Sequence, residues 1–128
     1  MFHYTDYLPG SVDVSLLEFA RRVAESSSSR YRVGAVIARQ KPLSSSPNIM
    51  SKSHPTRAPK SHCAEFRAVR KARTDLSGAE IYVVRVKRNG APGLSKPCTW
   101  CEELLRSIGI VRAVYSTYDP PYYQVDNY

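Results

Sequence analysis

The sequence predicts one α/β domain in which helices pack on the faces of a sheet. Helix-like and strand-like segments alternate along the chain in the order α-β-(β)-α-β-α-β, and such alternation is typical of this class. The chain has 128 residues, 42% of them hydrophobic and 23% charged, so it can bury a core and is not disordered by composition. We therefore treat residues 1–128 as a single domain, with a core at about 14–118 and a short tyrosine-rich tail at 119–128.

The first half of the chain predicts one helix and one buried strand. Apolar residues at positions 16, 19, 20, 23 and 24 have helical spacing. Asp13 or Ser15 can cap the start of this helix, and the serine run at 26–29 ends it. The run 33–38 is short, apolar and β-branched, which indicates a strand. Residues 40–61 form a long polar connection with at most a second strand near 42–46.

The second half predicts two helices and two strands. Ser61 opens a helix whose apolar stripe lies at positions 64, 68, 69 and 72, and residues 79–86 form the clearest strand. Pro97 suits the first turn of the next helix, because its missing N–H costs nothing there, and Gly109 ends that helix. A strand follows at 110–115, and the tail after Pro121 predicts no further element.

Charge and cysteine content exclude several classes of protein. Nineteen Lys and Arg against eleven Asp and Glu give a net charge of +8, which favours anionic partners such as nucleotides or nucleic acid. No apolar run approaches the roughly 20 residues of a membrane span, and the N-terminus lacks the features of a secretory signal. Three cysteines are too few for a disulfide scaffold. We expect a cytoplasmic protein with reduced thiols and no membrane partner.

The three cysteines lie at the starts of the second and third predicted helices. Cys98 and Cys101 share a helix face at i and i+3, and a helix N-terminus stabilises the thiolate that a metal requires. Three protein ligands leave a fourth zinc position open for water, as in catalytic sites. Glu65 follows Cys63 by two residues, so it can reach that water and act as a general acid and base.

Three other interpretations of these residues remain open. Cys98 and Cys101 could be a redox pair with Cys63 as a core thiol, although Glu65 would then have no role. His62 could complete a structural zinc site, although neighbouring helical residues point about 100° apart. A third interpretation is a zinc-stabilised binding module without turnover, against which the intact Glu65 argues.

The sequences Cys63-Ala64-Glu65 and Pro97-Cys98-Thr99-Trp100-Cys101 resemble the zinc signature of the cytidine/deoxycytidylate deaminase superfamily. The resemblance extends over residues 14–118 and includes the segments 33–37, 52–55, 95–98 and 109–110. It implies a three-layer fold with a central mixed sheet of about four to five strands and helices on both faces. It also implies one Zn²⁺ per chain, held by Cys63, Cys98 and Cys101.

The same resemblance implies the reaction and the residues that touch the substrate. The family removes the C4 amino group of cytosine by hydrolysis, with Glu65 moving protons to N3 and then to the departing amine. Residues in the family's substrate-contacting positions are Asn48, His54, Ala64 and Tyr118. The family's fifth strand and last helix are predicted to be missing or shortened after Tyr118.

The predicted substrate is a free (deoxy)cytidine nucleoside or nucleotide such as deoxycytidylate. Cysteine at position 63 is typical of the free-nucleoside branch, whereas the residues around Pro97 and the run 110–116 resemble the deoxycytidylate branch. The alternative is deamination of cytosine (or adenine) within single-stranded DNA or RNA, which the charge of +8 and a stacking role for Tyr118 and Tyr122 would favour. The short chain without accessory elements favours the free substrate, and a homo-oligomer is left open.

Overall fold

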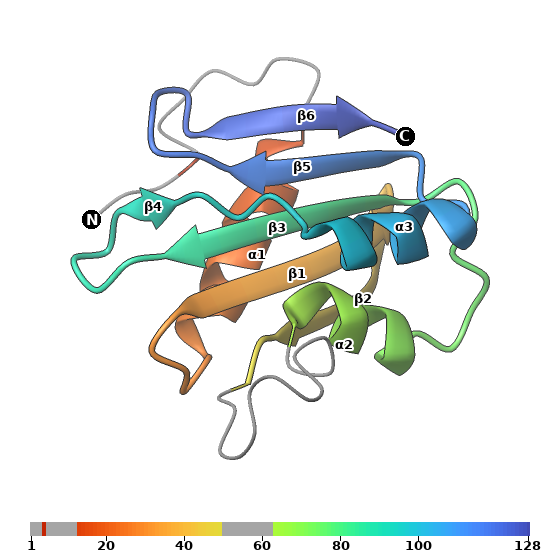
Figure 1. The fold of residues 1–128 in the computed structure, drawn as a ribbon, viewed down its shortest axis with the longest axis horizontal. Helices are drawn as coiled ribbons and strands as arrows, with labels where there is room; N and C mark the ends of the chain where they lie inside the picture. The colour runs from red at the N-terminus through yellow and green to blue at the C-terminus, as the bar shows by residue number, and fades with distance from the viewer. Residues whose placement is uncertain (1–3, 5–12, 50–62) are drawn as a thin grey trace.

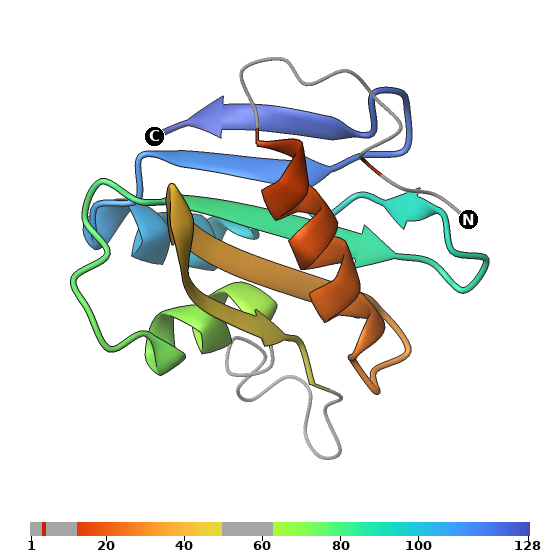
Figure 2. The same ribbon diagram turned by 180° about the vertical axis from the view of Figure 1, so that it is seen from behind.

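A computed structural model of the protein describes Tyr4 and residues 13–49 and 63–128. Its core is a six-stranded mixed sheet in the order β2-β1-β3-β5-β6, with the short β4 paired to β3. Only β3 and β5 run parallel, and the other neighbours are antiparallel. Helix α1 covers one face and helices α2 and α3 cover the other (Figures 1 and 2). The predicted three-layer architecture is confirmed. The sheet has one strand more than the four to five expected, and this count includes β4, which has only two residues.

The bounds of the elements follow the sequence pattern closely. Helix α1 spans Val14–Glu25, and strands β1 and β2 span Arg32–Arg39 and Lys41–Pro47. Helix α2 spans Ala64–Lys71, strand β3 spans Glu80–Val86, and β4 is Pro92–Gly93. Helix α3 spans Thr99–Ser107, followed by β5 at Arg112–Ser116 and β6 at Tyr123–Asn127.

Side chains that alternate along β1, β3 and β5 build two separate cores. One core packs Val36, Tyr82 and Val114 against α1, and the other packs Ala35, Val83 and Tyr115 against the side of α2 and α3. Gly34 is required at the first contact, because a Cβ there would lie 2.4 Å from the Ala20 carbonyl oxygen of α1. The central strands are therefore held rigidly between the two helical layers.

Two details of the predicted helices are corrected. Pro97 does not lie in the first turn of α3, because the helix begins at Thr99 with Cys98 as its N-cap. Helix α2 likewise begins at Ala64 after the N-cap Cys63, and Ser61 lies outside the described residues. Asp13, one of the two predicted caps of α1, accepts a hydrogen bond from the Ser15 N–H at 3.0 Å.

The tail, from whose sequence no element is predicted, forms a short strand. After β5 the chain reverses in a tight turn, in which the Tyr122 N–H donates to the Asp119 carbonyl at 2.7 Å and Tyr122 has a φ of 69°. The tail then pairs with β5 as the edge strand β6. No helix in the described ranges combines the length and the apolar character needed to cross a bilayer.

Candidate metal centre and active-site pocket

Two helix N-termini bring three cysteine sulfurs together. Cys63 is the N-cap of α2 and Cys98 the N-cap of α3, while Cys101 lies in the first turn of α3. Their Sγ atoms all lie within 4.8 Å of one another. Cys101 is buried, Cys63 is half-buried and Cys98 is exposed, so the cluster sits at the edge of the core. This is the placement that the sequence spacing predicts.

The donor set fits a zinc ion. Tetrahedral zinc with Zn–S bonds of about 2.3 Å requires sulfurs roughly 3.8 Å apart, which agrees with the observed clustering. A hydrogen bond with Cys63 and burial raise the pKa of the Cys101 thiol, and the negative charges of neighbouring groups raise it further. Three thiolates at this distance therefore need a cation, while the two helix N-termini already favour their negative charge. The cluster forms one zinc-binding centre per chain.

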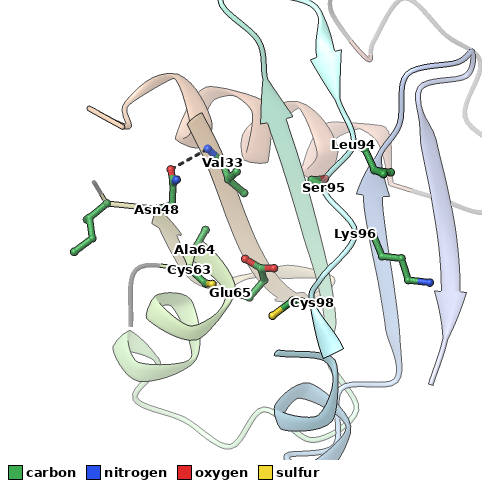
Figure 3. Close-up of a pocket in the computed structure, with 10 residues that line it drawn as sticks. Val33, Asn48, Cys63, Ala64, Glu65, Leu94, Ser95, Lys96 and Cys98 are labelled. Atoms are coloured by element: carbon green, nitrogen blue, oxygen red, sulfur yellow. Dashed lines mark hydrogen bonds between the residues drawn. The ribbon is translucent and has the colours of Figure 1, made fainter. Parts of the chain in front are cut away.

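Glu65 lies beside the sulfur cluster but outside it. It occupies the first turn of α2, is 7% exposed, and points into the space between α2 and the segment before Cys98 (Figure 3). Burial raises the pKa of its carboxyl group, with a smaller opposing effect of its own backbone N–H. A buried carboxyl that is no part of the three-sulfur set is placed to handle protons rather than to bind the metal.

The cluster opens into a pocket of about 340 Å³. Its walls come from the start of β1, the end of β2, the N-terminus of α2 and the segment that leads into α3 (Figure 3). Two of the lining residues, Ile49 and Leu94, are exposed apolar side chains. The lining residues are Val33, Asn48, Ile49, Cys63, Ala64, Glu65, Leu94, Ser95, Lys96 and Cys98.

Asn48 lines the pocket, but most of its amide group already has partners. Its Oδ1 accepts from the Val33 N–H at 2.9 Å and from the Ser27 hydroxyl at 2.7 Å. Its Nδ2 donates to the Tyr31 carbonyl oxygen at 2.6 Å. The side chain thus ties the end of β2 to the loop before β1, and one N–H of the amide has no partner among the described residues.

The other predicted substrate contacts fall in different places. Ala64 is buried in the pocket wall as the first residue of α2. Tyr118 is 53% exposed and is not among the lining residues, and the Lys87 Nζ lies 5.6 Å from its ring centroid. His54 lies outside the described residues, as does His62. Trp100 packs against Phe66 with ring centroids 5.4 Å apart.

Sequence reasoning missed the wall formed by Leu94, Ser95 and Lys96. The Ser95 hydroxyl donates to the Val83 carbonyl at 2.7 Å and accepts from the Ser116 N–H at 3.0 Å, which holds this segment on the sheet. The signal that could have found it is proximity, because these residues immediately precede Pro97 and Cys98. Val33 and Ile49 carried no such signal, since apolar residues at strand ends are usually core.

A three-cysteine metal centre beside a buried carboxyl, open to a pocket, defines the class of zinc-dependent hydrolytic centres rather than that of closed structural sites. Residues 11–117 match the cytidine and deoxycytidylate deaminase zinc-binding region. The chain belongs to this deaminase family.

Solved structures share the fold. A deoxycytidylate (dCMP) deaminase from the cyanophage S-TIM5, crystallised in apo form, matches with a TM-score of 0.63 and 18% sequence identity over 86% of each chain. A variant of the cytidine deaminase from Mycobacterium tuberculosis matches with a TM-score of 0.54 and 21% identity, over 88% of this chain and 90% of that one. A search of curated protein sequences finds no significant match.

Proposed function

We propose that this protein removes the C4 amino group of cytosine from a free (deoxy)cytidine nucleoside or nucleotide such as deoxycytidylate. One observation carries this proposal: the buried Glu65 lines a pocket at a cluster of three cysteine sulfurs, which lie within 4.8 Å of one another. Its volume of about 340 Å³ suits a small ligand. Membership of the deaminase family supports the same reaction.

The proposed chemistry divides between the metal and the carboxyl group. A zinc ion held by the three sulfurs supplies Lewis acidity, which lowers the pKa of a water molecule to about 7. Glu65 takes a proton from the attacking water and gives it to N3 of the ring as the C4–O bond forms. It then takes the proton of the new C4 hydroxyl and gives it to the amino group, so that the C4–N bond breaks as the C4 carbonyl forms. Cytosine and water thus become uracil and ammonia. The burial that raises the pKa of Glu65 favours the protonated form that it needs as a donor.

The proposed substrate contacts are residues of the pocket wall. Asn48 has one amide N–H left for an acceptor on the substrate. Ala64 begins α2, where backbone N–H groups have no partner inside the helix. Ile49 and Leu94 offer exposed apolar surface in the pocket lining to the entering base. Tyr118 is not proposed as a contact of the free substrate, because it does not line the pocket.

A substrate panel tests the proposal directly. Cytidine, deoxycytidine, deoxycytidylate and an oligonucleotide that contains cytosine are incubated with the zinc-loaded protein under one condition, with adenosine as the control. We expect ammonia and the matching uracil compound from a free substrate, and faster turnover of it than of the oligonucleotide. Deamination confined to the oligonucleotide, or of adenosine alone, would contradict the proposal.

Replacement of Glu65 by glutamine separates proton transfer from metal binding. The amide keeps the size of the side chain but cannot carry the proton, so Glu65→Gln should lose roughly 10²–10⁴-fold or more in kcat. Zinc content and melting temperature should stay close to those of the unchanged protein, because Glu65 is not part of the sulfur cluster. Activity equal to that of the unchanged protein would rule out this role.

A further inference from the structure

Another, smaller cavity lies at the start of β1 and the end of β3. It has a volume of about 200 Å³ and is lined by six residues, four of which carry positive charge. The six residues are Arg30, Tyr31, Arg85, Val86, Lys87 and Arg88. Such a concentration of cations in a concave site favours an anionic ligand.

The positive charge of this cavity is not neutralised by the protein. Among the described residues, no Asp or Glu forms an ion pair with Arg30, Arg85, Lys87 or Arg88. The guanidinium of Arg85 instead stands 4.7 Å from the ring centroid of Tyr31. Its buried Nε has no hydrogen-bond partner within the described part of the chain.

The register of the sheet places Arg85 beside the active-site pocket. Arg85 pairs with Val33 of β1, and Val33 lines the pocket. Side chains of directly paired residues lie on the same face with Cβ atoms about 5 Å apart. Arg85 also pairs with Gly93, whose neighbour Leu94 lines the pocket as well. Arg85, which lines the basic cavity, is therefore paired with residues at the active-site pocket on both neighbouring strands.

The position of Arg85 is fixed by its surroundings. A Cβ at Gly93 would lie 3.0 Å from the Arg85 Cδ, so the absence of a side chain at position 93 lets the arginine stem pass. The guanidinium stands over the Tyr31 ring, and the backbone of Tyr31 is held in turn, because its carbonyl accepts from the Asn48 Nδ2 at 2.6 Å. Asn48 itself lines the pocket. The guanidinium is thus held in place before a ligand arrives, which reduces the entropy lost on binding.

We propose that Arg85, supported by Arg30 and Lys87, binds the phosphate group of a free nucleotide whose base occupies the active-site pocket. The inference rests on the proposed function and assigns a phosphorylated substrate to it. A guanidinium offers paired donors that match phosphate oxygens. A single strand would instead need cations spread along a groove that follows its backbone, whereas these cations converge on one small cavity.

The first test compares nucleotide and nucleoside turnover. The ratio of kcat/KM for deoxycytidylate to kcat/KM for deoxycytidine should exceed one in the unchanged protein and should fall about tenfold or more in Arg85→Gln. The exposed Arg30→Gln should lower it in the same direction. Arg22→Gln is the matched control, because Arg22 also stands over an aromatic ring, that of Phe19, but on α1 across the sheet. Its ratio should not change.

The second test needs no turnover. Binding of the product-type ligands deoxyuridylate and deoxyuridine is measured by calorimetry at low and high salt with the zinc-loaded protein. We expect tighter, more salt-dependent binding of the nucleotide, and loss of that difference in Arg85→Gln but not in Arg22→Gln. Equal affinity for both ligands in the unchanged protein would overturn the phosphate site. An oligonucleotide that binds more tightly than the mononucleotide through Arg85 would overturn the assignment to a free nucleotide.

Failure of the site and failure of the proposed function give different results. If no cytosine compound is deaminated but the nucleotide still binds more tightly than the nucleoside through Arg85, the proposed function fails and the phosphate site stands. If deoxycytidine and deoxycytidylate are deaminated with equal kcat/KM, the proposed function stands and the phosphate site fails.

Discussion

Asn48 shows at the scale of one residue that a side chain in the pocket can have a structural role as well. Its amide joins the Ser27 hydroxyl, the Val33 N–H and the Tyr31 carbonyl, which belong to the loop before β1 and to its start. Tyr31 in turn supports the guanidinium of Arg85. The residue that resemblance assigns to the substrate therefore also shapes the wall that the substrate meets.

Replacement of Asn48 by alanine should lower stability as well as affinity for the substrate. Removal of the amide breaks three hydrogen bonds and leaves the Val33 N–H and the Tyr31 carbonyl without this partner, so the free energy of unfolding should fall by roughly 1–3 kcal/mol. Urea denaturation measures the change. Ser27→Ala removes one of these three bonds together with the contacts of the same hydroxyl to the Asn48 carbonyl oxygen and the Ser29 N–H, so it should lower stability as well. A variant that loses affinity for the substrate but unfolds at the same urea concentration would contradict the structural role.

The residues of the metal centre were predictable and the rest of the pocket was not, for a physical reason. Cysteine spacing and the Glu65 position carry chemistry that few other functions require, so a short local pattern suffices. Arg85 carries no such pattern, because an arginine at the end of a strand is usually solvated. Its role follows from its pairing with Val33 and Gly93, and register is a nonlocal property.

At the scale of elements, the segment from β4 to α3 is held on the sheet by two buried serines. The Ser116 hydroxyl donates to the Gly93 carbonyl at 2.5 Å and accepts from the Arg85 N–H at 2.9 Å. It also lies 2.8 Å from the Ser95 hydroxyl. These bonds join β3, β4 and β5 just before Cys98. They fix the path of the chain toward the metal ligand.

Loss of the Ser116 hydroxyl should loosen this segment. Ser116→Ala leaves the Arg85 N–H and the Gly93 carbonyl without this buried partner, so stability should fall by about 1–3 kcal/mol. Zinc should also be removed faster by a chelator, because the strand that leads to Cys98 is less restrained. Ser107→Ala is the control, since that exposed hydroxyl bonds only to a carbonyl of its own helix. Equal chelation rates in all three proteins would show that the serines do not support the metal centre.

The elements that sequence predicted best are those that bury an apolar face. In helix α1 and in strands β1 and β3, the buried face is visible in the sequence as a local pattern of apolar residues. The sequence of β2, Lys41–Pro47, has almost no apolar alternation, and β6 is a partly exposed edge strand. Both form through pairing with a neighbouring strand, and a pattern within the segment does not encode such pairing. For this reason no strand is predicted from the sequence of the tail.

At the scale of the whole molecule, the zinc centre joins two helices that lie far apart in the sequence. Cys63 is separated from Cys98 by the whole of α2 and β3 and by the β4 segment. Because the unfolded chain has no preformed site, the free energy of zinc binding adds to the free energy of folding. The metal centre is therefore part of the fold as well as of the proposed chemistry.

Removal of zinc should lower the melting temperature, and the loss should depend on pH. Zinc at a hundred times its Kd stabilises the folded chain by about 2.7 kcal/mol, so chelation should shift the melting temperature by several degrees. Metal binding displaces protons from the thiols, so acid competes with zinc, and the difference between the loaded and the chelated protein should shrink from pH 8 to pH 5. Differential scanning calorimetry with and without a chelator at pH 8 and at pH 5 measures this difference.

In the Cys63→Ala, Cys98→Ala double variant the chelator should have no effect on the melting temperature, because only the Cys101 sulfur remains of the cluster. Full zinc retention in that variant would place the metal elsewhere.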